Sequence, residues 1–549
     1  MTPSTGQTPR AALTVDLDVR LDDAALRAAV LEAPWLAAAD IDARPDAADP
    51  DVILLVIDRA LTPDEEQRLL ARAATTPLVL AGPTLDRLAA GSALAEAAGL
   101  LAAGLSPEHE IRLRAAVPVD PRGHGDVLVR DRAVLVDKAV GDVEVGVTCD
   151  LALTTYPVAT WRAATGVGAL TVGSGPQPWT ERDFLRLVHR WLRTVLGRAE
   201  GPAVRVAMLG YGAIGHEHSK AAQRVPGLVF AGVCDSNPER VAAAHGLAPD
   251  VRAYADGAAL IAADDLDLIV VSTPPDSHHR WARQALEAGK HVVLEKPMAL
   301  SSVECDDLLA LAAAQDRTLL VYQNRRWDTD YLALRAAVTA GRIGEVFHLE
   351  TFVGGYGHPC NYWHSDAGVS GGAIFDWGSH VLDQVLDLVP GEIDYVTAAN
   401  HKRRWHDVTN ADHSRVTLRM ADGVEAEFVY SDLAAALKPK WYVLGTEGAV
   451  LGQWRQERVV ARNAIGTLDE DVLAPADSPA DLFLHAPDGS VTAMAVPPAP
   501  PYAFHRELAD ALLAGLPTTV TAEGSRRVVA VMEAAERSAL DDGRPVVPR

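Results

Sequence analysis

Cysteine is scarce in this sequence. The 549 residues include only four, Cys149, Cys234, Cys305 and Cys360, and none belongs to a CxxC pair. Scattered cysteines of this kind argue against structural disulfides and indicate a reducing compartment. The sequence also lacks an apolar run of about 18 residues, the length that a membrane-spanning helix needs, and a cationic leader followed by an apolar segment. We therefore expect a cytoplasmic protein.

The sequence also has fewer basic than acidic residues. Lys and Arg number 50 against 74 Asp and Glu, which gives a formal net charge of −24. Because such a chain repels phosphate groups, its charge argues against nucleic acids and anionic membranes as partners. The hydrophobic and charged fractions, 48% and 23%, are ordinary for a globular protein. The length exceeds what one hydrophobic core supports and predicts several domains.

The most informative stretch begins with an apolar run. Val204–Leu209 predicts a buried strand, and Gly210-Tyr-Gly212-Ala-Ile-Gly215 follows it directly. A helical pattern and a second strand come next, and that strand ends at Asp235. A glycine turn between a strand and a helix lets backbone amides approach a pyrophosphate, and a carboxylate about 20 residues later can bind a ribose diol. This order predicts a dinucleotide-binding unit.

Residues 11–197 alternate apolar runs with helical segments. Val52–Ile57 and Leu78–Ala81 predict buried strands, Thr62 and Pro63 predict a helix start, and Thr180 predicts the cap of a later helix. Such alternation favours a parallel sheet covered by helices. This region resembles the trehalose-utilisation (ThuA-like) family on the segments Asp51–Asp58, Leu61–Glu65, Pro157–Trp161, Gly166–Gly168, Val172–Ser174 and Trp179–Leu196.

The ThuA-like resemblance implies a flavodoxin-type α/β domain with a glutamine-amidotransferase-like fold. An amidotransferase needs a cysteine at a strand-to-helix elbow. Cys149 is the only cysteine in this region, and no glycine-rich elbow surrounds it. We therefore expect an accessory, non-catalytic domain, with a disordered tail at 1–10 before it and a linker at 198–202 after it.

The rest of the chain carries further motifs: VSTPPDSHH at 271–279, GKHVVLEKP at 289–297, YQNRRWD at 322–328 and GGAIFDWGSH at 371–380. With the glycine turn, they resemble the Gfo/Idh/MocA oxidoreductase family over residues 203–549. The resemblance implies a doubly wound Rossmann domain at 203–328 and an α+β domain at 329–549. The second domain should have an open, mostly antiparallel sheet that makes a dimer or tetramer, and its C-terminal helix should pack back on the Rossmann domain. The stretch 464–501, rich in Pro and Asp, predicts an irregular excursion.

Three residues are expected to carry the chemistry. Lys296 follows a buried strand and precedes a proline, where members of the family bend the chain into the cofactor cleft. Asp376 and His380 are four residues apart, so on a helix they share one face. A histidine can take a hydroxyl proton near neutral pH. We expect His380 to act as general base with Lys296 as hydrogen-bond partner, or the reverse, and Asp376 to orient His380 and bind hydroxyls.

A larger set is expected to hold the cofactor, at the glycine turn, after the second strand and at the ends of later strands. It consists of Gly210, Tyr211, Gly212, Ala213, Ile214, Gly215, Asp235, Ser236, Arg240, Ser272, Thr273, Pro274, His278, Glu295, Lys296, Asn324 and Arg325. Asp235 favours NAD because a carboxylate repels a 2′-phosphate, whereas Ser236 and Arg240 keep NADP open.

The expected substrate contacts are Lys296, Tyr356, Trp363, His364, Asp376 and His380. An aromatic and polar loop of this kind suits a sugar or polyol. His358, Cys360 and His364 could instead be metal ligands, but their spacing matches no standard set, so we expect no metal.

These observations predict an NAD(P)-dependent oxidoreductase that transfers hydride between nicotinamide and a hydroxyl carbon of a sugar, inositol or related polyol. A redox-assisted glycosidase, which oxidises a sugar transiently, eliminates the glycoside and reduces the sugar again, is an alternative. A non-catalytic, nucleotide-sensing regulator is another. The substrate, the reaction direction and the role of residues 11–197 stay open.

Overall fold

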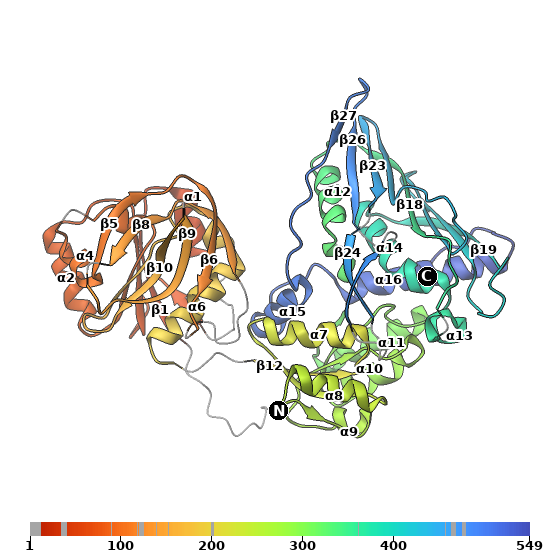
Figure 1. The fold of residues 1–549 in the computed structure, drawn as a ribbon, viewed down its shortest axis with the longest axis horizontal. Helices are drawn as coiled ribbons and strands as arrows, with labels where there is room; N and C mark the ends of the chain where they lie inside the picture. Colours follow the sequence, from red (N-terminus) through yellow and green to blue (C-terminus); the bar gives the residue numbers. More distant parts are fainter. Residues whose placement is uncertain are drawn as a thin grey trace. The chain divides into compact units, whose positions relative to one another are not determined.

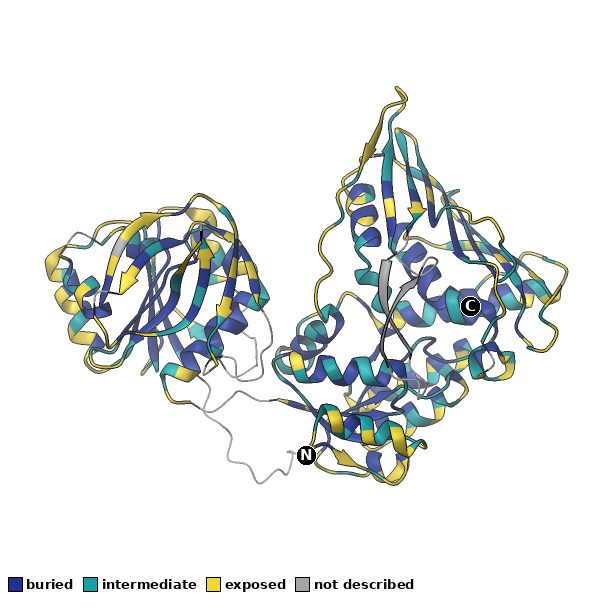
Figure 2. Ribbon diagram, in the orientation of Figure 1, coloured by how far each residue is buried: buried dark blue, intermediate teal, exposed yellow. Residues whose placement is uncertain are grey.

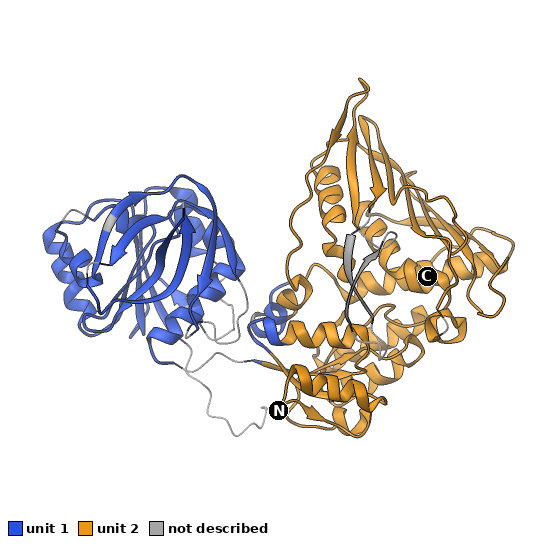
Figure 3. Ribbon diagram, in the orientation of Figure 1, with its two compact units in different colours: residues 1–203, 223–228, 509–517 blue, residues 204–222, 229–508, 518–549 orange. Residues whose placement is uncertain are grey.

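The structure is a computed structural model of the chain. It describes residues 13–33, 41–88, 91–117, 119, 126–138, 140–151, 153–198, 203–360, 362–455, 457–462, 468–474 and 479–549. The tail at 1–10 and most of the expected linker lie outside these residues. The chain divides into two compact units (Figures 1 and 3). Unit 1 comprises residues 1–203, 223–228 and 509–517, and unit 2 comprises residues 204–222, 229–508 and 518–549.

Unit 1 is built on a nine-stranded sheet of order β2-β1-β3-β4-β11-β10-β9-β6-β7. Its strands are β1 (Leu13–Arg20), β2 (Ile41–Arg44), β3 (Val52–Ile57), β4 (Leu78–Ala81), β6 (His109–Ala115), β7 (Val127–Asp131), β9 (Glu144–Leu151), β10 (Thr154–Arg162) and β11 (Val167–Leu170). β5 (Leu100–Leu105) and β8 (Val134–Lys138) pair separately. The helices are α1 (Ala24–Leu31), α2 (Pro63–Ala73), α3 (Pro83–Asp86), α4 (Ala93–Ala98), α5 (Gln177–Thr180) and α6 (Arg182–Val195).

The parallel sheet expected in this region is correct for one half only. β2, β1, β3, β4 and β11 pair in parallel, and β3, an apolar run that is buried throughout, lies in the middle of them. The strands from β10 to β7 pair antiparallel. α2 begins as expected, because Thr62 and Glu65 form a capping box and Pro63 occupies the first turn.

Thr180 is not the cap of the long helix, which corrects the sequence prediction. Thr180 ends the short helix α5, and its hydroxyl donates to the Gln177 carbonyl. Glu181 stands at the N-cap of α6 instead. The sequence pattern missed α5 because a single helical turn is too short to show a period.

The first half of unit 2 is a six-stranded sheet of order β14-β13-β12-β15-β16-β17. Its strands are β12 (Val204–Leu209), β13 (Leu228–Cys234), β14 (Arg252–Ala253), β15 (Leu268–Val271), β16 (His291–Leu294) and β17 (Leu319–Val321). Its helices are α7 (Ala213–Arg224), α8 (Pro238–Leu247), α9 (Gly257–Ile261), α10 (His278–Glu287) and α11 (Ser302–Gln315). The pairs β12–β15, β15–β16 and β16–β17 run parallel, as a doubly wound fold requires.

The second half of unit 2 is an eight-stranded sheet of order β19-β20-β21-β18-β22-β23-β26-β27. Its strands are β18 (Val346–Gly354), β19 (Ile393–His401), β20 (His413–Met420), β21 (Glu425–Ser431), β22 (Trp441–Gly445), β23 (Gly448–Trp454), β26 (Ala480–His485) and β27 (Val491–Ala493). β24 (Glu457–Arg462) and β25 (Leu468–Ala474) form a separate ribbon. The helices are α12 (Thr329–Thr339), α13 (Ala367–Ser370), α14 (Ala373–Leu388), α15 (Ala503–Ala514) and α16 (Ala522–Leu540).

This sheet is mostly antiparallel, as expected, with one parallel pair, β18 and β21. The expectation of an irregular stretch at 464–501 is wrong at β25, β26 and β27, which pair with β24, β23 and β26 respectively. The reason is tertiary. The buried carboxylate of Asp330 accepts hydrogen bonds from the Ala480 amide at 3.0 Å and from the Trp441 indole at 3.2 Å, which anchors the start of β26.

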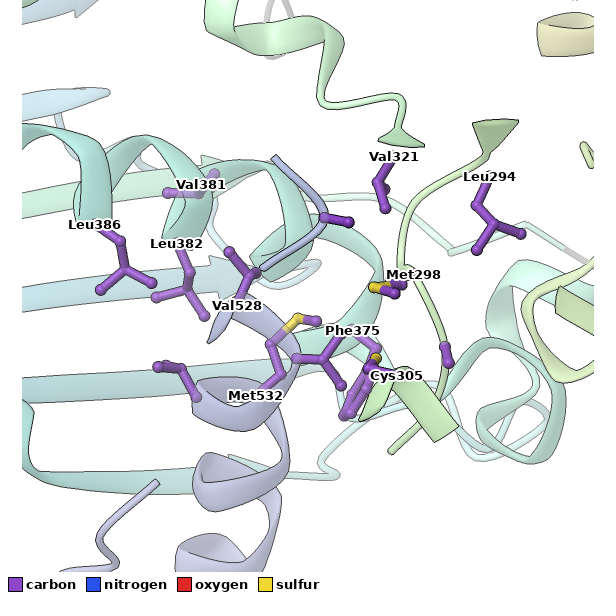
Figure 4. Close-up of a cluster of buried hydrophobic side chains, with 14 of the residues drawn as sticks. Leu294, Met298, Cys305, Val321, Phe375, Val381, Leu382, Leu386, Val528 and Met532 are labelled. Atoms are coloured by element: carbon purple, nitrogen blue, oxygen red, sulfur yellow. The ribbon is translucent and has the colours of Figure 1, made fainter. Parts of the chain in front are cut away.

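The two halves of unit 2 share a hydrophobic core. Figure 4 shows side chains of the Rossmann half, such as Leu294 and Met298, together with Phe375 of α14 and with Val528 and Met532 of α16. α16 thus packs against the Rossmann half. Buried residues line the strands of both units in Figure 2. Within the described part of the chain, no helix has the length and apolar character needed to cross a membrane.

Candidate functional site

The glycine turn after β12 has the geometry of a phosphate cradle. Gly210 has φ +93°, and a Cβ there would lie 2.6 Å from the Ser272 carbonyl oxygen. A Cβ on Gly215 would lie 2.4 Å from the Gly210 carbonyl oxygen. Gly212, by contrast, faces open space, with Arg240 at 3.8 Å as the nearest group. Two glycines are therefore required by packing, and the third leaves room for a pyrophosphate at the N-terminus of α7.

Asp235 lies at the carboxyl end of β13 beside this turn. Its carboxylate accepts hydrogen bonds from the Tyr211 amide at 2.6 Å and the Asn237 amide at 2.8 Å. Arg240 approaches the same carboxylate at 3.6 Å. Because each carboxylate oxygen has two lone pairs, Asp235 can still accept a hydroxyl. Ser236 is exposed next to it.

The loop after β15 braces the turn. The Ser272 hydroxyl donates to the Gly210 carbonyl at 2.7 Å, and the Thr273 and Ser277 hydroxyls lie 2.7 Å apart. His278 is completely buried, and its two ring nitrogens lie 2.8 Å from the Pro297 carbonyl and 2.9 Å from the Thr273 carbonyl. A neutral imidazole has one N–H, so His278 donates to one of these carbonyls and its other nitrogen faces the second. His278 therefore supports the loop, and its assignment to the cofactor set stays a prediction.

Lys296 of the Rossmann half meets α14 of the second half. Its ammonium lies 2.8 Å from the Asp376 carboxylate and 3.1 Å from the Asp376 carbonyl oxygen. The Lys296–Pro297 peptide bond is cis, and α14 begins after Gly371 and Gly372, which both have positive φ. This contact joins two of the three expected catalytic residues, and the third, His380, interacts electrostatically with both.

Asp376 is held as a carboxylate. Burial would raise its pKa, but Lys296 and His364 keep that pKa well below its usual range. The His364 Nδ1 atom lies 3.6 Å from the Asp376 carboxylate. The close contacts of this carboxylate are with Lys296 and His364, whereas its interaction with His380 is electrostatic. That Asp376 orients His380 stays a prediction. Spacing on a helix places two residues on one face but does not make them bond to each other.

His380 lies one turn further along α14 and is buried. Burial lowers its pKa well below the ordinary value, and the charges of Lys296 and Arg325 lower it further. The imidazole is therefore neutral at neutral pH. Its Nδ1 atom is buried and has no hydrogen-bond partner among the described residues. A buried nitrogen of this kind fits a site whose remaining partner is a ligand.

The loop from β18 to α13 contains three of the expected substrate contacts, and one of them, His364, lies next to Asp376. The rings of Trp363 and His364 stack with centroids 3.6 Å apart, which places His364 at Asp376. Tyr356 is exposed, and the Arg404 guanidinium lies over its ring. The three candidate metal ligands have separate partners: His358 pairs with Asp407 at 2.8 Å, Cys360 lies 3.3 Å from the Ser365 hydroxyl, and His364 faces Asp376.

Two further expected residues lie after β17. Asn324 and Arg325 begin a short 3-10 helix, Asn324–Trp327. The Arg325 guanidinium lies 5.1 Å from the centre of the Trp377 ring on α14, and the Arg325 carbonyl accepts a hydrogen bond from Gln384 at 2.6 Å. Arg325 thus also links the two halves of unit 2.

Sequence reasoning missed Tyr430 and Asp432. The Tyr430 hydroxyl donates to the Asp432 carboxylate at 2.7 Å, and burial raises the pKa of Asp432 to about 6. Both groups interact electrostatically with Asp376. Their position at the end of the strand β21 could have indicated them in the sequence, because polar side chains often line a site where a strand ends.

Comparisons with known proteins match the two halves of unit 2. Residues 204–323 match the model of an oxidoreductase family with an NAD-binding Rossmann fold, and residues 331–451 match a GFO/IDH/MocA C-terminal domain. An inositol 2-dehydrogenase of Rhizobium meliloti is 31% identical over 258 residues, which cover 46% of this chain and 76% of that protein. The scyllo-inositol 2-dehydrogenase (NADP(+)) IolW of Bacillus subtilis is 25% identical over 352 residues, 63% of this chain and 96% of that protein.

A solved NAD-binding protein of Listeria innocua has 27% sequence identity and a TM-score of 0.53, over 63% of this chain and 96% of its own. Several other curated relatives are matched over only about half of their length. The two domain models together extend over the glycine turn, Lys296, Asp376 and His380, and the R. meliloti enzyme is matched over three quarters of its length. The chain therefore belongs to the Gfo/Idh/MocA oxidoreductase family.

Proposed function

We propose that this chain is an NAD(P)-dependent dehydrogenase or reductase that acts on a CH–OH group of a sugar, inositol or related polyol. The observation that carries the proposal is the 2.8 Å contact between Lys296 of the Rossmann half and Asp376 of the second half. It lies beside the buried, neutral imidazole of His380. The inositol dehydrogenase names of two relatives support a polyol as substrate.

The cofactor would be held by the glycine turn and by Asp235. The open face at Gly212 fits a pyrophosphate, and the carboxylate of Asp235 fits a ribose diol. When bound, the nicotinamide supplies or accepts hydride. The remaining task of the protein is to orient the substrate hydroxyl and to move its proton.

Lys296 and His380 divide that task. The Lys296 ammonium, fixed by Asp376, would donate a hydrogen bond to the reacting oxygen. His380 would accept the hydroxyl proton at Nδ1, because its low pKa keeps the ring neutral and this nitrogen has no partner among the residues that the structure describes. Asp376 would hold Lys296 and, with His364, contact neighbouring hydroxyls.

The direct test offers NAD+ and NADP+ with a panel of inositols, aldoses and alditols and follows the absorbance of the reduced cofactor. Turnover with at least one polyol is expected. Release of an aryl leaving group from an aryl glycoside without net reduced cofactor would favour the redox-assisted glycosidase. No turnover with any substrate, together with no binding of either cofactor, would refute the proposal.

Asp235 is expected to set the cofactor preference toward NAD. In Asp235→Ser, the ratio of the Kd values for NADH and NADPH should move toward NADPH by about 10-fold or more, which is ~1.4 kcal/mol. The cause is the loss of a carboxylate that binds a ribose diol and repels a 2′-phosphate. Fluorescence titration with both reduced cofactors measures the ratio. Asp276→Ser, which changes an acidic residue outside the predicted cofactor set, is the control and should leave the ratio unchanged.

For unit 1 we propose the accessory, ThuA-like role expected from its sequence. Cys149 lies on β9, an antiparallel strand, and is buried. Burial, with a smaller contribution from Asp150, raises the pKa of its thiol to about 11. A thiol in this state is a poor nucleophile. The dimer or tetramer formed through the second sheet of unit 2 also stays a prediction.

A further inference from the structure

A buried chain of three side chains runs behind Lys296. The His505 Nε2 atom lies 2.8 Å from the His218 Nδ1 atom, and the His218 Nε2 atom lies 3.0 Å from a Glu295 carboxylate oxygen. The other oxygen of Glu295 accepts a hydrogen bond from the Lys296 amide at 3.3 Å. The exposed fractions of His505, His218 and Glu295 are 3%, 1% and 9%.

The three residues come from separate elements. His218 lies on α7, whose N-terminus forms the phosphate cradle, and His505 lies on α15. Glu295 directly precedes the catalytic lysine. The ring of Tyr322 packs on both histidines, with centroids 4.3 Å and 5.3 Å away. This row of three hydrogen-bonded side chains therefore connects the cofactor-binding helix to Lys296 through a region that is shielded from solvent.

Each hydrogen bond between these three side chains can form with either partner as the donor. A neutral imidazole has one N–H and one acceptor nitrogen. When Glu295 is ionised, His218 donates to it from Nε2, and His218 Nδ1 accepts from His505. When Glu295 is protonated, its O–H donates to His218 Nε2, and His218 then donates from Nδ1 to His505 Nε2. His505 carries its own N–H at Nδ1 in this state, so both rings have changed tautomer. One proton on Glu295 thus reverses both bonds without placing a charge on either ring.

The electrostatics of the cluster agree with this description. Burial lowers the pKa of His218 to about 3 and that of His505 well below its ordinary value, so both rings stay neutral. Burial raises the pKa of Glu295 to about 7, against the opposing effects of Lys296, His278 and His364. Tyr322 is also coupled to Glu295, and its pKa is raised, so its hydroxyl stays protonated.

We propose that His218 and His505 are positioning residues for Lys296, and that they act by holding Glu295 through this reversible chain of hydrogen bonds. The inference rests on the proposed dehydrogenase function. An ionised Glu295 places negative charge beside Lys296 and favours proton uptake in the cleft. These hydrogen bonds therefore link the helix that binds the cofactor to the charge of Glu295 beside Lys296.

Two amide substitutions at one position separate the contacts of His218. The amide of His218→Gln reaches the position of Nε2 and keeps the bond to Glu295. The shorter amide of His218→Asn reaches only the position of Nδ1 and loses that bond. We expect His218→Asn to lower kcat by about 10²-fold, the scale of a small misplacement of a catalytic group, with little change in the Kd of the cofactor. His218→Gln should keep most of the activity.

The matched control is another histidine–carboxylate pair in unit 2. His279 of α10 lies 2.7 Å from Asp307 of α11, where the histidine side chain is 29% exposed. His279→Asn and His279→Gln should both keep the wild-type kcat. Equal kcat values for His218→Asn, His218→Gln and the wild type would overturn the proposal.

A second measurement does not depend on turnover or on the stability of His218→Asn. In wild-type protein labelled with 15N-histidine, the ring nitrogens of His218 and His505 should change tautomer together near pH 7, and neither ring should become an imidazolium. Glu295→Gln should abolish this transition. It should also flatten the rise in the oxidation rate through the same pH, because the charge can no longer appear. Ring signals that do not respond to pH would contradict the reversible chain.

The outcomes separate the two proposals. If the wild type turns over polyols and His218→Asn is fully active, the proposed function stands and this inference is refuted. A wild-type protein that binds no cofactor and oxidises nothing refutes the proposed function, and the NMR titration then still tests the chain.

Discussion

Lys296→Met is expected to lower kcat by about 10²–10⁴-fold, the usual contribution of a group that handles a proton in the transition state. The Kd of the cofactor should change little, because the glycine turn and Asp235 lie on other strands. The substitution removes the hydrogen-bond donor to the reacting oxygen and leaves Asp376 without its ammonium partner, which lies 2.8 Å away. Steady-state kinetics on the best polyol, with cofactor titration in parallel, measures both effects.

The control for this variant is Lys438→Met. Lys438 also pairs with a carboxylate, Glu350, at 2.6 Å, but does so on the sheet of the second half. It should keep the wild-type kcat. Lys296→Met/Asp376→Asn tests whether an unpaired carboxylate contributes to the loss. If the single variant keeps more than about one tenth of the wild-type kcat, Lys296 does not handle the proton as proposed.

His380→Ala is expected to lower kcat by a similar factor, about 10²–10⁴-fold, because it removes the proposed proton acceptor. Added imidazole should restore part of the activity by entering the space that the side chain leaves. The pH dependence of kcat should also report the protonation of His380. The pKa of His380 is well below its ordinary value because of burial, so protonation of this ring should inactivate the wild type only far below neutral pH.

His189→Ala is the matched control for the loss of a buried imidazole. His189 lies on α6 of unit 1, and burial lowers its pKa to about 4. Its removal should leave kcat unchanged. If His380→Ala keeps full activity while Lys296→Met is inactive, then Lys296 is both the hydrogen-bond donor and the proton acceptor.

Much of the site was predictable because its signals are local. A tight turn needs glycine at fixed positions, so Gly210 and Gly215 indicated the cradle before any contact was known. The helical spacing of Asp376 and His380 correctly placed them one turn apart. It could not predict that Asp376 interacts with Lys296 and His364, because that choice depends on which elements pack against α14.

The errors share this cause. β26 looked irregular because its partner, β23, and its anchor, Asp330, are distant in the sequence. The burial of His278 between two carbonyls of separate segments was likewise not evident from the local pattern. The pair of His218 and His505 joins residues that are 287 positions apart, and no periodicity records such a contact.

By itself, then, the sequence determined the Rossmann turn, the order of the main elements and the family motifs, because these depend on backbone conformations that neighbouring residues impose. Only the tertiary structure decided the partner of Asp376, the neutral state of His380 and the buried chain behind Lys296. Those properties depend on desolvation and on contacts between distant segments, which exist only once the two halves of unit 2 have packed around one core.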